Sequence, residues 1–130
     1  MRWTLAFVLL TACGPSPVHP AADAATTFGP RTGAICPTPA VTYASFGRSF
    51  FATYCTTCHS VALTGAARAG APVEFDFDTV GDVRAHLAAI DEVAASGPSA
   101  TNVQMPFAGP TPTLGERQQL GQLLACAVPD

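Results

Sequence analysis

The chain contains no lysine, and its acidic groups outnumber its basic ones. Its 130 residues include six arginines and nine carboxylates, which gives a formal net charge of −3. A protein that binds nucleic acid needs a basic face for the phosphates, and this composition does not supply one. We therefore expect no nucleic-acid partner.

Long hydrophobic runs and the motifs of common enzyme classes are also missing. The mostly apolar stretch over residues 3–10 is too short to cross a bilayer, which takes about 20 residues. No nucleophile elbow, phosphate-binding loop or zinc-binding helix pattern occurs in the sequence. We predict that the protein is not an enzyme and takes no small-molecule substrate.

Strand patterns are scarce, whereas helical patterns are clear. Residues 74–78 alternate between acidic and aromatic side chains, but no second run of this kind exists to pair with them. Three segments instead place apolar residues at helical spacing after a threonine that can cap a helix. These helices are expected from Tyr43 into residues 55–59, from Val80 to about Ala95, and from Thr113 to a stop at Pro129, with Thr42, Thr79 and Thr113 as caps. The sequence predicts an all-α domain.

The N-terminus resembles a bacterial lipoprotein signal. Arg2 precedes the short apolar run, which ends in Leu10-Thr11-Ala12-Cys13. In such a signal the cysteine is lipidated and becomes the mature N-terminus, so residues 1–12 are predicted to be a signal peptide. The alternative is cleavage among residues 21–25. A lipid on Cys13 would hold the protein on the periplasmic side of a bacterial membrane, and Gly14 slightly favours the outer membrane.

Residues 13–35 are rich in proline and alanine and have no apolar period. This composition is typical of a flexible linker, so we expect a tether ahead of one domain that spans residues 36–130.

The most specific motif in the chain is Cys55-Thr56-Thr57-Cys58-His59. In an exported protein, Cys-x-x-Cys-His is the attachment signature of a c-type haem. Three residues apart on a helical turn, the two thiols lie on one face, where each can add to a vinyl group of the same porphyrin. The imidazole that follows is then carried beneath the iron as the proximal ligand. A redox dithiol and half of a zinc site are the alternatives, although no second Cys/His pair at ligand spacing occurs.

Met105 is the candidate for the sixth ligand of the iron. It is the only methionine beyond the predicted signal, and it lies in a proline-rich segment, residues 96–112. Connections of this length without secondary structure are uncommon unless they serve a function. A thioether is a soft ligand that suits a low-spin haem iron. His86 is the alternative ligand, and a methionine that fills a gap in the core is the plainer interpretation.

The remaining cysteines suggest a disulfide. If Cys13 carries lipid and the motif cysteines carry haem, Cys36 and Cys126 are left near the two ends of the domain. A bond between them would close a loop of about 90 residues, and the alternative is two free buried thiols.

Together these residues resemble class I cytochromes c. The pattern Gly47-x-x-x-Phe51-x-x-x-Cys55-x-x-Cys58-His59 matches the first-helix pattern of that family, and Met105-Pro106 matches its axial methionine. The resemblance implies a small fold of three main helices and long loops wrapped around one covalent haem c. It further implies that Gly47 lies at a helix crossing against Leu120, Gly121 or Leu124, that Phe51 packs on the haem side, and that the loop near Pro72 supplies the carbonyl that orients His59.

A haem iron with both axial positions filled has no site for a substrate, so its simplest use is to take and give one electron. We expect a monohaem electron carrier that serves redox partner proteins in the bacterial envelope. The alternatives are a haem-based sensor or minor peroxidase with a labile sixth ligand, and a haem-free lipoprotein. Arg68 and Arg84 are candidates to neutralise haem propionates, and the six carboxylates between Glu74 and Glu92 predict a solvated acidic face.

Overall fold

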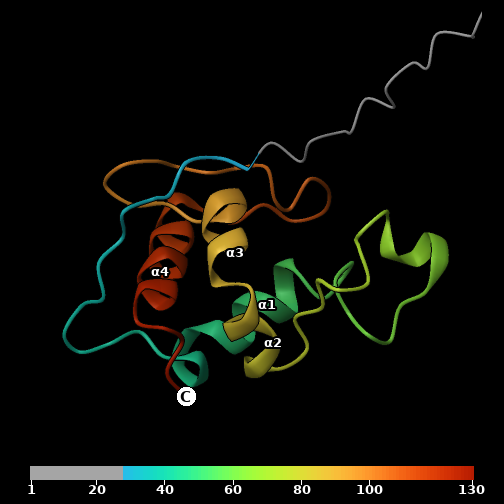
Figure 1. Ribbon diagram of the computed structural model, residues 1–130, viewed down its shortest axis with the longest axis horizontal. Helices are drawn as coiled ribbons and strands as arrows, with labels where there is room; N and C mark the ends of the chain where they lie inside the picture. Colours follow the sequence, from blue (N-terminus) through green and yellow to red (C-terminus); the bar gives the residue numbers. More distant parts are fainter. Residues whose placement is uncertain (1–27) are drawn as a thin grey trace, which may run out of the picture.

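The computed structural model describes residues 28–130, and this part of the chain is helical (Figure 1). It contains no strand, and its one β-bridge pairs Ser96 with Thr101. The all-α prediction therefore holds for the described residues. The predicted signal peptide, Cys13 and the first part of the tether lie outside them. None of the described helices is both long and apolar enough to cross a membrane.

Six helical elements follow one another along the chain. They are η1 (Tyr43–Gly47), α1 (Arg48–Tyr54), η2 (Gly65–Arg68), α2 (Val80–Ala85), α3 (Leu87–Ala94) and α4 (Leu114–Ala125). All three predicted threonine caps are confirmed, because each threonine hydroxyl accepts the backbone N–H three residues on. The side chain of that third residue bonds back to the N–H of the cap, which completes a capping box in all three helices.

All three predicted helices differ from the structure in extent. The first is divided into η1 and α1 and ends at Tyr54, before the cysteine motif. The expected helix over residues 80–95 is broken at His86, whose φ of −125° and ψ of 21° separate α2 from α3. The break coincides with aromatic packing, because the His86 ring lies 4.6 Å from that of Phe75. The last helix ends at Ala125, and Cys126 caps it three residues before Pro129.

The core forms where α3 and α4 lie side by side above α1 and α2 (Figure 1). Its most deeply buried side chains come from all four α-helices and the chain end. They include Phe51, Val83, Ile90, Leu120, Leu123 and Val128. The two ends of the domain also meet, because the Tyr43 N–H donates to the Pro129 carbonyl at 2.7 Å.

Residues 28–35, part of the predicted tether, are packed against α3. Thr32 is fully buried, and its N–H and hydroxyl both donate to the carboxylate of Asp91. Arg31 forms an ion pair with Glu92 at 2.7 Å. Cys36 and Cys126 lie at disulfide distance, as predicted, with their Cα atoms 4.7 Å apart. The packed domain therefore begins before residue 36, because Thr32 compensates a buried carboxylate that α3 cannot satisfy alone.

Gly47 allows η1 to approach α4 closely. A Cβ atom at this position would lie 2.9 Å from Leu123 Cδ2 and 2.7 Å from Tyr43 Cδ2. The neighbour on α4 is thus Leu123 and none of the three residues expected from the family pattern. Gly121 instead allows the backbone at Ser96 and the side chain of Ala34 to lie close to α4, because a Cβ at this position would meet the Ser96 carbonyl oxygen and Ala34.

We predict that Gly47→Ala destabilises the protein by about 1–3 kcal/mol, since the added methyl must displace buried side chains. Gly115→Ala is the matched control in α4, where the nearest atom to a new Cβ is 4.0 Å away. That variant should be neutral or up to about 1 kcal/mol more stable. Urea unfolding of the two variants checks the difference, and equal stabilities would contradict the close approach.

Candidate functional site

The cysteine motif folds as a compact turn directly after α1. The Cys55 N–H donates to Phe51 O at 2.9 Å and caps the helix. The turn then closes on itself, because the Cys58 and His59 N–H groups both donate to Cys55 O, at 3.1 and 2.9 Å. This geometry directs both cysteines and the histidine into one cavity. Neither cysteine of the motif is paired in a disulfide.

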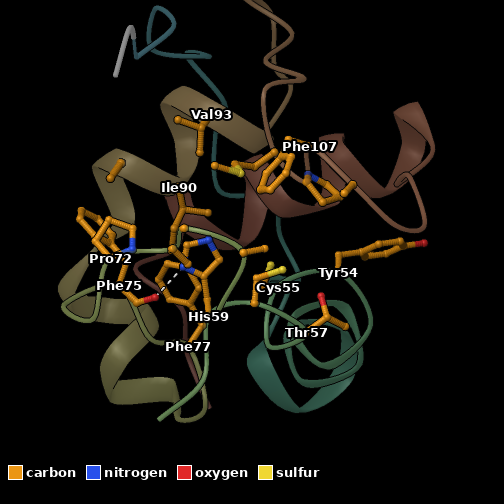
Figure 2. Close-up of a pocket in the computed structure, with 18 of the residues that line it drawn as sticks. Tyr54, Cys55, Thr57, His59, Pro72, Phe75, Phe77, Ile90, Val93 and Phe107 are labelled. Atoms are coloured by element: carbon orange, nitrogen blue, oxygen red, sulfur yellow. Dashed lines mark hydrogen bonds between the residues drawn. The ribbon is translucent and has the colours of Figure 1, made fainter. Parts of the chain in front are cut away.

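The cavity has a volume of about 280 Å³ and is partly open to solvent. Val93 and Phe107 lie at one end of it, and His59, Phe75 and Phe77 lie at the other (Figure 2). Its lining is almost entirely apolar and carries no Asp, Glu or Arg side chain. Phe51 is part of that lining, as the family pattern implies. The cavity therefore suits an apolar ligand.

His59 is held in one orientation by the loop that follows it. Its Nδ1 lies 2.6 Å from the carbonyl oxygen of Phe75, and Figure 2 shows this hydrogen bond at the cavity wall. The main chain reinforces the arrangement, because the Phe77 N–H donates to His59 O at 3.0 Å. A carbonyl can only accept, so Nδ1 carries the proton and Nε2 keeps its lone pair. That tautomer is the one a metal-binding imidazole needs.

The orienting carbonyl belongs to the loop near Pro72, as the family pattern suggested, and it is the carbonyl of Phe75 and not that of Pro72 itself. The Pro72 carbonyl instead accepts hydrogen bonds from Arg68 at 2.8 Å and from the Phe75 N–H at 3.1 Å. These bonds form the turn that presents the Phe75 carbonyl to His59.

Met105 lines the same cavity as the cysteine motif, from the loop between α3 and α4. Its N–H donates to Val93 O at 2.9 Å, and its own carbonyl accepts from Arg117 at 2.9 Å. His86, the alternative ligand, is not among the lining residues. Its ring packs instead on Phe75, at the junction of α2 and α3. The structure thus brings Cys55, Cys58, His59 and Met105 to one cavity and leaves His86 out of it.

The two arginines expected to meet haem propionates are engaged elsewhere. Arg68 is buried, donates to the carbonyls of Ser60, Ala71 and Pro72, and pairs with Asp76 at 2.7 Å. Arg84 donates to the Val128 carbonyl and pairs with Asp130. Both side chains therefore hold loops and chain ends in place, and a contact of either with a haem propionate stays a prediction.

The carboxylates between Glu74 and Glu92 do not form a solvated acidic face. Five of the six bond to nearby groups, and only Glu74 and Asp78 among the six are exposed residues. The five are Asp76 with Arg68, Asp78 with Ser60 and Val61, Asp82 with Thr79, Asp91 with Thr32, and Glu92 with Arg31. These groups hold loops and caps in place.

Asp78 makes folding stability depend on pH. The Ser60 hydroxyl and then the Val61 N–H hydrogen-bond its carboxylate, at 2.7 and 2.8 Å, and lower the pKa of Asp78. A carboxyl with a depressed folded-state pKa stabilises the fold above its unfolded-state pKa of about 4. That contribution is lost as the pH falls through the folded-state pKa.

We therefore expect Asp78→Asn to be less stable than wild type at pH 7, by about 1 kcal/mol or less because the carboxylate is exposed. The difference should shrink as the pH falls below about 4 and should vanish below the folded-state pKa, where the wild-type carboxyl is also neutral. Urea unfolding at pH 7 and pH 3 measures it. A difference that stays constant across this range would mean that the charge contributes nothing.

Burial raises the pKa of the Cys55 thiol to about 12. This thiol is protonated at neutral pH, whereas a redox dithiol relies on a cysteine with a depressed pKa. The electrostatics of the turn therefore give the redox-dithiol alternative no support.

Arg117, which bonds to the backbone of Met105, is a residue that the sequence interpretation did not single out. It is 3% exposed and donates to three backbone carbonyls, one of them that of Met105. The sequence did contain a clue to its burial. Arg117 shares one face of its helix with Leu120 and Leu124, and an arginine on a buried face needs hydrogen-bond acceptors.

No group of three or more His, Cys, Asp or Glu side chains converges in residues 28–130 in a way that could hold a metal ion. A zinc site therefore has no such set of ligands in this part of the chain. A haem iron takes only one His and one Met from the protein, so this finding does not bear on the haem interpretation. In comparisons with known proteins, the chain matches no family model, no curated protein and no solved structure.

Proposed function

We propose that this protein carries one covalently attached haem c and transfers single electrons in the bacterial envelope. The observation that carries the proposal is the convergence on one apolar cavity of Cys55, Cys58, His59 and Met105. The first three are adjacent in the chain, but Met105 lies 46 residues beyond His59 and reaches the cavity through tertiary packing.

Each of these residues has a definite role in the proposal. Cys55 and Cys58 would hold the macrocycle through thioether bonds, and His59 and Met105 would be the axial ligands. When bound, the haem supplies one-electron chemistry at its iron. The hydrogen bond from Nδ1 to Phe75 O orients the His59 ring and leaves Nε2 of the neutral imidazole free to bind the iron. The mostly apolar lining lowers the polarity around the iron, which favours the less charged ferrous state.

A class I cytochrome c arrangement is part of the same proposal. The approach of Gly47 to Leu123, where η1 meets α4, supports it, because this family crosses its first and last helices at a glycine. Support also comes from the His59 hydrogen bond to a loop carbonyl and from the methionine on the loop before the last helix.

The cellular setting in the proposal follows from the sequence. A lipid on Cys13 would tether the domain to the periplasmic side of a membrane, with the outer membrane favoured by Gly14. Redox proteins of the envelope would be its partners, since a carrier needs both a donor and an acceptor.

The test is the absorption spectrum of the protein matured in a host that attaches haem c. We expect covalent haem, a low-spin spectrum, and the weak red sulfur-to-iron charge-transfer band of a methionine-ligated ferric haem. A low-spin spectrum without that band would shift the sixth ligand to a histidine. A high-spin spectrum, with ready binding of carbon monoxide, would favour the sensor or peroxidase alternative, and a colourless protein would overturn the proposal.

A further inference from the structure

Arg117 occupies an unusual position for a charged side chain. It lies in the first turns of α4 with 3% of its surface exposed, and no carboxylate contacts its guanidinium among the described residues. Three hydrogen bonds compensate its burial, all from Nη1. The acceptors are the carbonyls of Ala94 at 2.7 Å, Asn102 at 3.0 Å and Met105 at 2.9 Å. A buried cation with only neutral acceptors is costly, and it is retained where its contacts are needed.

The three carbonyls belong to segments that must be held together. Ala94 is the last residue of α3, so the guanidinium lies at the negative end of that helix dipole. Asn102 begins the approach to Met105, and its amide side chain donates to the carbonyls of Pro30 and Asp91. Its backbone N–H donates to Ala95 O at 2.9 Å. Arg117 therefore joins the end of α3 to both ends of the segment over residues 102–105.

Met105 itself is held on both sides of its Cα atom. Its N–H donates to Val93 O in α3, and its carbonyl accepts from Arg117 in α4. Two helices thus fix the backbone that carries the thioether, while the side chain lines the cavity.

We infer that Arg117 is a positioning residue that holds Met105 as the sixth ligand of the haem iron, an inference that rests on the proposed function. The hydrogen bond from Arg117 restrains the loop of Met105 against opening. The buried positive charge of Arg117 is in direct contact with the backbone carbonyl of Met105. Without Arg117, Met105 would leave the iron more readily, and external ligands would enter faster.

The experiment compares Arg117→Met, Arg117→Lys and wild type as haem-loaded proteins. Arg117→Met keeps the length and apolar stem of the side chain but removes the charge and the donors. Arg117→Lys keeps the charge with a single donor head. Arg84→Gln is the control, because Arg84 also donates to a backbone carbonyl, that of Val128, and pairs with Asp130, and none of these three residues lines the cavity.

Three readouts report on the position of Met105. They are the sulfur-to-iron band of the ferric protein, the rate at which carbon monoxide binds the ferrous protein, and the hydrogen exchange of the Met105 amide. For Arg117→Met we expect loss of the band or its disappearance at lower pH, carbon monoxide binding roughly tenfold faster or more, and faster amide exchange. Arg117→Lys should fall between this variant and wild type.

The control separates positioning from general destabilisation. Arg84→Gln should lower the unfolding midpoint but keep the band and the wild-type rate of carbon monoxide binding. If it loosens Met105 as much as Arg117→Met does, or if Arg117→Met keeps all three wild-type readouts, the inference is overturned. If Arg117→Met does not fold, Arg117→Lys decides, and wild-type readouts in that variant would overturn the inference. A wild-type protein without the sulfur-to-iron band would instead overturn the proposed ligation, and the inference with it.

Discussion

Replacing Met105 with alanine should convert a closed haem protein into one with an open sixth position. The sulfur-to-iron band should disappear, ferrous protein should bind carbon monoxide readily, and the reduction potential should fall by on the order of 100 mV. The physical reason is that a thioether favours ferrous iron, and the other sulfur atoms of the lining, those of Cys55 and Cys58, would be bonded to the macrocycle. Optical spectra and a redox titration of the matured variant measure these changes.

Two further variants define the identity of the ligand. Met105→His should stay low-spin without the sulfur-to-iron band, because an imidazole replaces the thioether. His86→Gln should keep the band, since His86 packs on Phe75 and does not line the cavity. If the band survives in Met105→Ala, or is lost in His86→Gln while Met105 is intact, the assignment of Met105 is wrong.

Removing the bond between Cys36 and Cys126 should produce the largest loss of stability. The two cysteines are separated by 90 positions, and in the chain-entropy model a loop of this size contributes about 4.5 kcal/mol. The bond ties the segment that carries Thr32 to the end of α4. The double variant Cys36→Ser, Cys126→Ser should therefore unfold at much lower urea concentration than the oxidised wild type.

Reduced wild type is the matched control for this variant. It should unfold like the double serine variant, because both lose the same cross-link. The sulfur-to-iron band should remain in native buffer, since neither cysteine lines the cavity. A loss below about 1 kcal/mol would mean that the segment around Thr32 is held without the bond.

The features that local chemistry controls could be predicted from the sequence. Thr42, Thr79 and Thr113 begin their helices as expected, because a capping box needs only residues within four positions of one another. The pairing of Cys36 with Cys126 followed from the roles assigned to the other cysteines. The convergence of Met105 on the cavity agrees with its choice as a candidate ligand.

Other features depended on contacts that no local pattern records. The break at His86 accompanies packing on Phe75, which lies on a separate loop. Arg68 looked like any surface arginine in the sequence, yet it is buried among the carbonyls of its own loop. Gly47 was expected to face Leu120, Gly121 or Leu124 at a helix crossing, but the residue of α4 nearest to it is Leu123.

The sequence by itself determined the all-α class, the helix starts, the cysteine pairing and the motif that names the candidate chemistry. Each of these depends on residue type at fixed short spacing or on the number of cysteines. The tertiary structure alone decided which carbonyl orients His59 and which cation holds the loop of Met105. Those bonds join residues 16 and 12 positions apart, through Phe75 and Arg117. They form only when α3, α4 and their loops pack together. Every residue has a backbone carbonyl, so the sequence does not indicate which carbonyl a distant donor will reach.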